Sequence, residues 1–137
     1  MIFVDANILM YAAGSPYPHK IPSLNLLRKI ASQNLPACTD AETFQEILHR
    51  YRSIGRWEDG RKLFLDARKI ISTIYPVTIE MLDMAVDLLV KHPTLMARDG
   101  LHAAGYFLHN ADVFCSYDRD FDAISGLRRV TPAAILR

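Results

Sequence analysis

Short apolar runs alternate with longer amphipathic segments along the chain. The runs are rich in β-branched and aromatic residues, and they predict strands at residues 2–4, 36–39, 74–77, 113–116 and 129–131. Apolar residues at helical spacing predict helices at residues 6–13, 21–33, 40–52, 57–72, 78–91 and 98–109. This alternation predicts an α/β fold, with a central parallel sheet of four to five short strands and helices on both faces. We expect a single domain over residues 1–137, because two domains of half this length would each have a marginal core.

Two of the predicted helices carry a clear apolar face. Asp40 is expected to cap the helix at 40–52, whose apolar face is Phe44, Ile47, Leu48 and Tyr51. The helix that starts at Thr78 is expected to bury Ile79, Leu82, Val86 and Leu89. Gly60 is expected to weaken the helix at 57–72, because glycine is a poor helix former.

Composition and charge limit the class of protein. Half of the 137 residues are apolar, which excludes a disordered chain, and 16 Lys and Arg against 15 Asp and Glu give a net charge of +1. This balance argues weakly against a strongly basic nucleic-acid binder. Cys38 and Cys115 are too few for a disulfide framework and are expected to be buried free thiols. The apolar runs fall short of the ~18 residues of a membrane helix, and Asp5 interrupts any signal peptide. We therefore expect a cytoplasmic protein that does not bind membranes.

Four acidic residues fall where this fold places its binding crevice. Asp5 and Asp118 directly follow predicted strands, Asp99 begins a helix, and Glu46 lies on the helix after the second strand. The carboxyl ends of parallel strands meet at one edge of the sheet, where ligands bind. Carboxylates that converge there repel one another unless cations lie between them. A site with oxygen ligands favours Mg²⁺ or Mn²⁺ over Zn²⁺.

Each of these residues also has a structural interpretation. Asp5 and Asp99 fit helix caps, Asp118 fits a turn, and Glu46 points away from the apolar face of its helix. His102 follows Asp99 by one turn, so that a hydrogen bond between them is possible, although a structural histidine is also compatible with the pattern. Basic residues outnumber acidic ones between residues 50 and 69, either as a solvated face or as a surface for phosphates. Periodicity alone does not decide between these interpretations.

Three segments, at residues 2–7, 97–104 and 111–121, together resemble the PIN-domain family, and more closely its VapC-type toxins. The first is a strand that ends in Asp-Ala-Asn, the second reads Asp-Gly-Leu-His-Ala-Ala, and the third ends in Ser-Tyr-Asp-Arg-Asp-Phe. Their order and spacing match the family from end to end. The resemblance implies a PIN-like domain and a metal-dependent endoribonuclease.

The resemblance also implies a set of site residues. It carries Asp5, Glu46, Asp99 and Asp118 over as the catalytic, metal-binding acids, with Mg²⁺ or Mn²⁺ as the cofactor. Glu46 is preferred to Glu42 because two apolar residues follow it, as in the family. Gly100 departs from the family, in which a helix former is commoner, and is expected to soften the first turn of its helix. Supporting residues are Asn7, Ser116, Asp120 and His102, and Arg98 and Arg119 are candidates for binding substrate phosphates.

The function implied is hydrolysis of RNA by metal-activated water, with 5′-phosphate and 3′-hydroxyl products, by the toxin of a type II toxin–antitoxin pair. The implied partners are an RNA substrate, a second copy of the chain in a homodimer, and a small antitoxin that docks on the helices at 40–52 and 57–72. The alternatives are a catalytically silent PIN-like scaffold and a PIN nuclease of RNA processing without an antitoxin. An Asp-nucleophile phosphatase is disfavoured, because Asn7 stands where a second Asp is required. Without the four site acids, 16 basic residues face 11 acidic ones, a balance that suits RNA.

Overall fold

The computed structural model describes residues 1–33 and 35–137. The five strands are β1 (Ile2–Val4), β2 (Ala37–Asp40), β3 (Thr73–Tyr75), β4 (Val113–Cys115) and β5 (Arg129–Val130). The helices are α1 (Ala6–Ala13), α2 (Lys20–Gln33), α3 (Ala41–Ser53), α4 (Trp57–Ile70), α5 (Ile79–Lys91), α6 (Ala97–Leu108) and α7 (Pro132–Leu136). A 3₁₀ helix covers Arg119–Ala123. The predicted strands and helices are confirmed with shifts of at most two residues at their ends, whereas α7 and the 3₁₀ helix were not expected.

The strands form one parallel sheet in the order β3-β2-β1-β4-β5. This arrangement confirms the predicted α/β fold with a five-stranded parallel sheet and helices on both faces. The strand order reverses between β1 and β4, which therefore form the switch point at which such sheets bind ligands. The residues that follow these two strands, Asp5 after β1 and Ser116 to Asp118 after β4, lie at this point.

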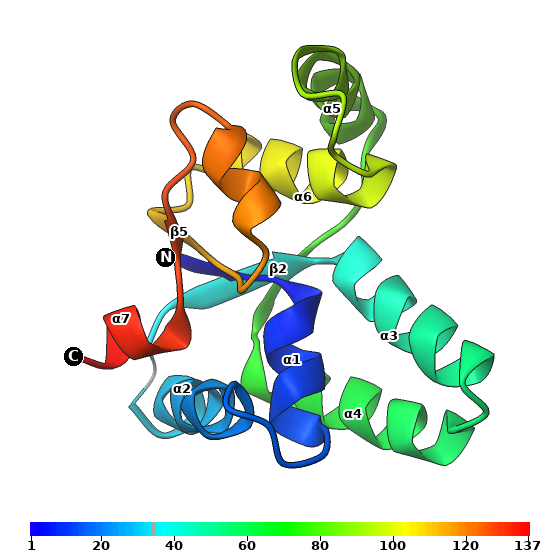
Figure 1. The fold of residues 1–137 in the computed structure, drawn as a ribbon, viewed down its shortest axis with the longest axis vertical. Coiled ribbons are helices and arrows are strands. Elements are labelled where there is room, and N and C mark those ends of the chain that lie inside the picture. The colour runs from blue at the N-terminus through cyan, green and yellow to red at the C-terminus, as the bar shows by residue number, and fades with distance from the viewer. Residues whose placement is uncertain (34) are drawn as a thin grey trace.

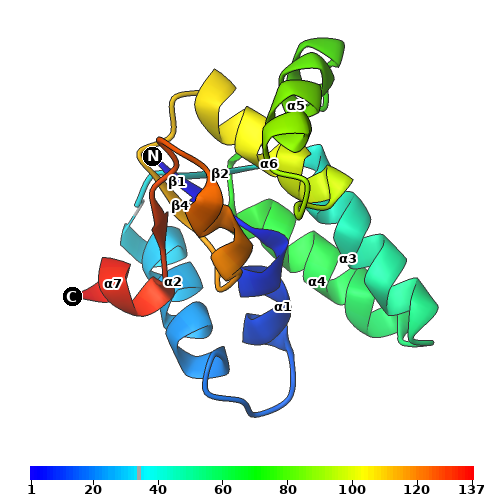
Figure 2. The same ribbon diagram turned by 45° about the horizontal axis from the view of Figure 1, so that its top comes forward.

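Helices cover both faces of the sheet (Figures 1 and 2), and each face has its own hydrophobic cluster. Successive side chains of a strand point to opposite faces, so that Ile2 and Val4 pack toward α1 to α4 whereas Phe3 packs toward α6. Cys38 and Cys115 are buried free thiols, as expected. Among the described residues no helix is long and apolar enough to cross a membrane.

The predicted core face of α5 is wrong in most of its positions. Met81 and Ala85 are buried and Leu89 is half-buried, whereas four apolar side chains on another side of the helix are exposed. These four residues form what we call the α5 stripe, with exposed fractions of 74% for Ile79, 43% for Leu82, 58% for Val86 and 77% for Val90. The reason is that α5 packs mainly on α6 and lies at the outer edge of the molecule (Figure 1). The side of α5 with Met81, Ala85 and Leu89 therefore faces inward.

Two glycines lie where paired helices approach most closely. A Cβ atom added to Gly60 in α4 would lie 2.4 Å from the Cβ of Tyr51 in α3, and one added to Gly100 in α6 would lie 2.7 Å from the Cγ of Leu89 in α5. Real Cβ atoms do not approach so closely. These glycines, which are expected to weaken their helices, therefore also leave the room in which α3 packs on α4 and α5 on α6.

Candidate functional site

A cavity of about 620 Å³ opens at the switch point, and the four predicted site acids all line it. Asp5 comes from the end of β1, Glu46 from α3, Asp99 from the first turn of α6, and Asp118 from the turn after β4. Glu42 and Asp120 are not among the residues that line it. Between the acids and the outer end of α3, the wall of the cavity carries basic residues, which are His49, Arg50, Arg56 and Arg98.

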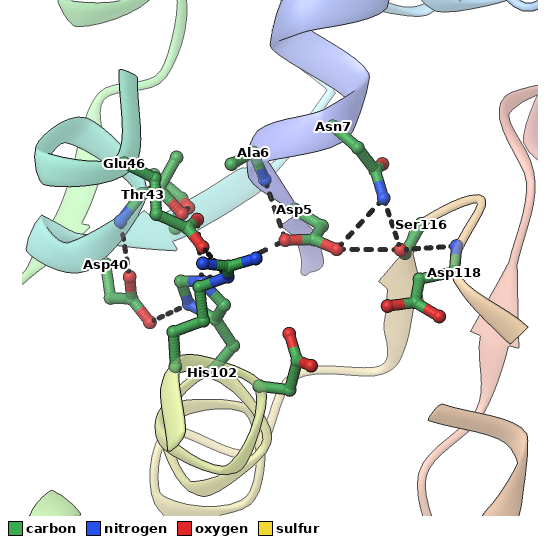
Figure 3. A network of polar contacts seen from close by, with 12 residues as sticks. Asp5, Ala6, Asn7, Asp40, Thr43, Glu46, His102, Ser116 and Asp118 are labelled. Atoms are coloured by element: carbon green, nitrogen blue, oxygen red, sulfur yellow. Dashed lines mark hydrogen bonds and ion pairs between the residues drawn. The ribbon is translucent and has the colours of Figure 1, made fainter. Parts of the chain in front are cut away.

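Asp5 is the most firmly held of these carboxylates (Figure 3). Its side chain is buried and caps α1, where Oδ1 accepts a hydrogen bond of 2.8 Å from the N–H of Ala6. Oδ2 accepts bonds of 2.7 Å from the hydroxyl of Ser116 and 3.2 Å from the amide of Asn7. Burial, with a smaller contribution from the charge of Glu46, raises the pKa of Asp5 to about 6, although His102, Ser116 and Ala6 act in the opposite direction. A buried carboxylate of this kind is a favourable place for a cation.

Asn7 and Ser116 link Asp5 to Asp118. The amide of Asn7 donates to Oγ of Ser116 at 2.9 Å, and the N–H of Asp118 donates to the same oxygen at 3.0 Å. Asp118 in turn accepts a bond of 2.9 Å from the N–H of Asp120, whose own side chain is exposed. The predicted supporting residues Asn7 and Ser116 thus contact the site acids directly, whereas Asp120 contacts Asp118 through its backbone.

Glu46 faces the cavity rather than open solvent, and its side chain is only 14% exposed. Its Oε1 lies 2.9 Å from Nε of Arg98, and its Oε2 lies 3.1 Å from Nε2 of His102. The helical pattern places Glu46 opposite the apolar face of α3, and in the fold this direction leads to the wall of the cavity. Glu46 is thus held between two basic side chains, one exposed and one buried.

His102 is fully buried, and its partner is not Asp99. Nδ1 of His102 lies 2.7 Å from Oδ2 of Asp40, and Nε2 lies 4.0 Å from Oδ1 of Asp5. Burial alone lowers the pKa of His102, but the charge of Asp40, hydrogen bonds with Asp40 and Glu46, and the charge of Asp5 together raise it well above its ordinary value. The proposed Asp99–His102 hydrogen bond is wrong, because Asp99 turns back to accept from the N–H of Met96 at 3.4 Å.

Asp99 and Asp118 both line the cavity. Burial and, to a smaller extent, the charge of Asp118 raise the pKa of Asp99, against smaller effects of Met96, His102 and Arg98. Asp5, Glu46 and the buried His102 behind them each offer a ligand atom, and these atoms lie within 4.8 Å of one another. The cavity thus presents several groups that can bind a cation.

The sequence did not point to Asp40 as part of the site. It was expected only to cap α3, and it does so, since its Oδ1 accepts a bond of 3.0 Å from the N–H of Thr43. Its second oxygen contacts His102. The signal that could have found it was present, because Asp40 ends a strand in the same way as Asp5 and Asp118 follow theirs.

The two arginines proposed for substrate binding differ in position. Arg98 lines the cavity and pairs with Glu46. Arg119 is exposed and lies in the 3₁₀ helix, outside the described lining of the cavity. The geometry therefore favours Arg98 over Arg119 as a contact for an anionic ligand.

Known proteins of similar sequence and structure were found along nearly the whole chain. The VapC ribonuclease Mb1869c of Mycobacterium bovis and the ribonuclease VapC13 of Mycobacterium tuberculosis are each 38% identical over 130 residues, which cover 95% of this chain and 99% of the relative. VapBC2 from Rickettsia felis, solved bound to a DNA fragment from its promoter, has a TM-score of 0.76 at 18% identity and covers 96% of this chain and 98% of that one.

A second solved structure has the same fold. VapC20 of Mycobacterium tuberculosis, described as a toxin that cleaves the sarcin–ricin loop, has a TM-score of 0.76 at 15% identity, over 95% of this chain and 98% of that one. The sequence model of the PIN domain matches residues 2–127. Together with the 38% identity to two VapC ribonucleases, this match establishes that the chain belongs to the PIN domain family and, within it, to the VapC ribonucleases.

Proposed function

We propose that this chain is a metal-dependent endoribonuclease that acts as the toxin of a type II toxin–antitoxin pair. The observation that carries the proposal is the convergence of Asp5, Glu46, Asp99 and Asp118 on one cavity, although they come from four separate segments of the chain. A fold does not by itself imply an activity, but this arrangement of carboxylates has the chemistry of a cation site. The relatives named as VapC ribonucleases support the same activity.

The donors around the cavity fit a hard divalent cation. They are mostly carboxylate oxygens, and the buried carboxylate of Asp5, with its raised pKa, gains most from a cation nearby. We assign Asp5, Asp99 and Asp118 to binding Mg²⁺ or Mn²⁺, and Glu46 to binding the ion or orienting the attacking water. A bound ion of this kind polarises the scissile phosphate and lowers the pKa of a water molecule, which favours hydrolysis to 5′-phosphate and 3′-hydroxyl ends.

The protein's own contribution is to hold these acids in fixed positions. Ser116 and Asn7 hold the carboxylate of Asp5 through hydrogen bonds from the side opposite His102. Asp118 is held by its backbone contact to Ser116, and Asp120, whose N–H donates to Asp118, is proposed as an auxiliary acid. Catalytic groups that are supported in this way need little reorganisation when the substrate binds.

The basic wall of the cavity supports RNA as the substrate. Arg98 lies beside the acids, and Arg50 and Arg56 continue the basic surface toward the outer end of α3. Phosphate groups on either side of the scissile bond would contact these side chains. Such contacts position the RNA strand without recognising its base sequence. Arg119 is a weaker candidate for the same role. An RNA substrate also places the activity in the cytoplasm.

The antitoxin is assigned to the surface of α3 and α4. Several solved relatives of the same fold are toxin–antitoxin complexes, among them one from Klebsiella pneumoniae. The cavity continues along α3 as far as Ile54, which is 44% exposed, and Leu65 of α4 is 46% exposed. A partner that covers these residues would lie next to the acids and block RNA.

The second copy of the chain is assigned to the α5 stripe. The stripe has apolar residues at positions 79, 82, 86 and 90, which lie along one side of a helix. A two-fold axis brings the same patch of both subunits together, so that one exposed helix face suffices to form a dimer. The stripe lies on a different helix pair from the proposed antitoxin surface, and both partners can bind at once.

The proposal is tested by cleavage of a labelled RNA in the presence of Mn²⁺. Asp5→Asn and Asp99→Asn are expected to lower the cleavage rate about 100-fold or more, whereas Asp66→Asn, which changes an exposed acid of α4, keeps the wild-type rate. Circular dichroism confirms that each variant is folded. Wild-type cleavage by folded Asp5→Asn contradicts the proposal, and a folded wild-type chain that cleaves no RNA and binds no Mn²⁺ in a calorimetric titration favours the scaffold function instead.

A further inference from the structure

A buried acid–histidine pair lies beside Glu46. Asp40 ends β2 and His102 lies in α6, 62 residues later, and neither side chain is exposed to solvent. Their contact of 2.7 Å joins Oδ2 of the acid to Nδ1 of the ring (Figure 3). Neither the family match nor the proposed acid site assigns a role to Asp40.

Asp40 uses both of its oxygens. Oδ1 accepts from the N–H of Thr43 and so fixes the start of α3, while Oδ2 fixes the ring of His102. Glu46 follows Thr43 by three residues on the same helix. One carboxylate therefore sets the position of the helix that carries Glu46 and of the ring that contacts its side chain.

The second ring nitrogen of His102 contacts Glu46. Nε2 of His102 lies 3.1 Å from Oε2 of Glu46. The other oxygen, Oε1, lies 2.9 Å from Nε of Arg98, whose side chain is 53% exposed. Both ring nitrogens of His102 thus contact a carboxylate oxygen, one of Asp40 and one of Glu46. The contact with His102 is the buried and therefore the more rigid of the two that hold Glu46.

Capping of α3 does not explain this arrangement. Thr78 caps α5 with one hydroxyl, which accepts a bond of 3.2 Å from the N–H of Met81. A single hydroxyl oxygen at position 40 would therefore be enough to cap α3. A buried charge, in contrast, costs free energy unless it is paired. Pairs of a carboxylate and a histidine recur where the ring must be held for a functional group. The second oxygen of Asp40 thus points to a role beyond folding of the helix.

We infer that Asp40 and His102 are positioning residues, which hold the carboxylate of Glu46 over the cavity in the orientation needed for cleavage. The inference rests on the proposed endoribonuclease function. It predicts that loss of the pair lowers kcat and leaves KM for RNA nearly unchanged, because neither residue lines the cavity or contacts the substrate.

Asp40→Ser separates the cap from the positioning role. The serine hydroxyl still accepts from the N–H of Thr43, but it is too short to contact His102. We expect kcat to fall 10- to 100-fold and KM to change less than threefold. Asp40→Asn has the same size but only one oxygen, which cannot serve Thr43 and His102 together, and we expect a smaller decrease of three- to tenfold.

The matched control is Thr78→Ala, which removes the cap of α5 far from the acids. It is expected to lose a similar amount of stability and to keep the wild-type kcat. Circular dichroism identifies any variant that does not fold, and in that case the more conservative Asp40→Asn decides. Wild-type kcat in either folded Asp40 variant overturns the inference.

A spectroscopic measurement tests the pair without cleavage. In ¹⁵N-labelled wild-type protein, the N–H proton on Nδ1 of His102 is expected to exchange slowly with water, because it is buried and hydrogen-bonded to Asp40. Asp40→Ser is expected to remove the Nδ1–H signal. If the wild-type chain cleaves no RNA, the proposed function fails while this measurement still reports the contact, whereas an unchanged signal in Asp40→Ser overturns the inference alone.

Discussion

The chain contains two helix hairpins, α3–α4 and α5–α6, that are built alike and end up in different surroundings. In each, the first helix has 13 residues, begins at a polar N-cap and packs closely on the second helix at a glycine. The apolar face of α3 is buried against the sheet and α4, with Ile47 fully inaccessible. Four apolar side chains of α5 lie on the outside as the α5 stripe.

The difference shows what an amphipathic pattern determines. Periodicity determines that a helix has an apolar side, but what covers that side depends on where the fold places the helix. The helix α3 lies over the sheet and carries Glu46 into the cavity, whereas α5 lies outside α6, which already covers the sheet (Figure 2). An apolar side that the fold leaves open is a surface for another protein.

The largest expected effect separates the two hairpins by activity. Glu46→Gln on α3 keeps the size of the side chain and removes its charge, and it is expected to lower the rate of RNA cleavage by about 10²- to 10³-fold. Glu80→Gln, the corresponding change of an exposed acid on α5, keeps the wild-type rate. Equal losses in the two variants would show that the acids act only through overall charge.

The next effect separates the hairpins by stability. Ile47→Ala leaves a cavity in the core and is expected to lower the free energy of unfolding by about 3 kcal/mol. Val90→Ala, at a residue 77% exposed in the α5 stripe, is expected to change it by less than about 0.5 kcal/mol. Urea unfolding at low protein concentration gives both values. A large loss at Val90 would mean that the stripe is covered within one chain.

The third prediction concerns association in solution. Val86→Glu places a charge in the α5 stripe, and an unpaired charge in an apolar contact costs about 2 kcal/mol or more. Light scattering is expected to give the mass of two chains for the wild type and of one for the variant. The control Leu65→Glu, at a residue of α4 that is 46% exposed, is expected to keep the mass of two chains. If the Val86→Glu variant remains dimeric, the dimer interface lies on another surface of the molecule.

The smallest expected effect is the dependence of cation binding on pH. Because burial raises the pKa of Asp5 to about 6, this carboxyl gains a proton below that pH in the metal-free chain. A divalent ion must then displace the proton, and its apparent affinity is expected to fall about tenfold per pH unit below 6. Calorimetric titration with Mn²⁺ between pH 7.5 and 5 measures this slope. The Asp5→Asn variant is expected to bind Mn²⁺ weakly, and the pH dependence of its affinity is expected to show no change near pH 6. The mass of the wild-type dimer is expected to stay constant over the same pH range.

The parts of the molecule that could be predicted from sequence are those set by local chemistry. The strand Ile2–Val4 and the cap at Asp40 follow from residue preferences within a few positions, and both are confirmed. The arrangement of Asp5 and Asp118 at one crevice follows from a general property of parallel sheets, which brings strand ends together without knowledge of side-chain packing.

The parts that could not be predicted depend on contacts between distant segments. No local pattern indicates that His102 contacts Asp40 rather than its neighbour Asp99, because that choice depends on how α6 crosses the sheet. The exposure of Val86 likewise depends on the position of α5 outside α6. In both cases the sequence limits the partners, and only the assembled fold selects among them.

The two glycines at the helix crossings also bear on how this protein can be engineered. Replacing glycine by alanine inside a helix is a common way to raise stability, and Gly60 and Gly100 are the obvious first choices here. Helix propensity alone predicts that each replacement raises the free energy of unfolding by about 1 kcal/mol. Here each added methyl group would collide with Tyr51 or Leu89 and push a hairpin apart. Homologues that carry larger residues at these positions must have compensating changes at the facing residue, so that the two positions of each crossing are expected to evolve as pairs.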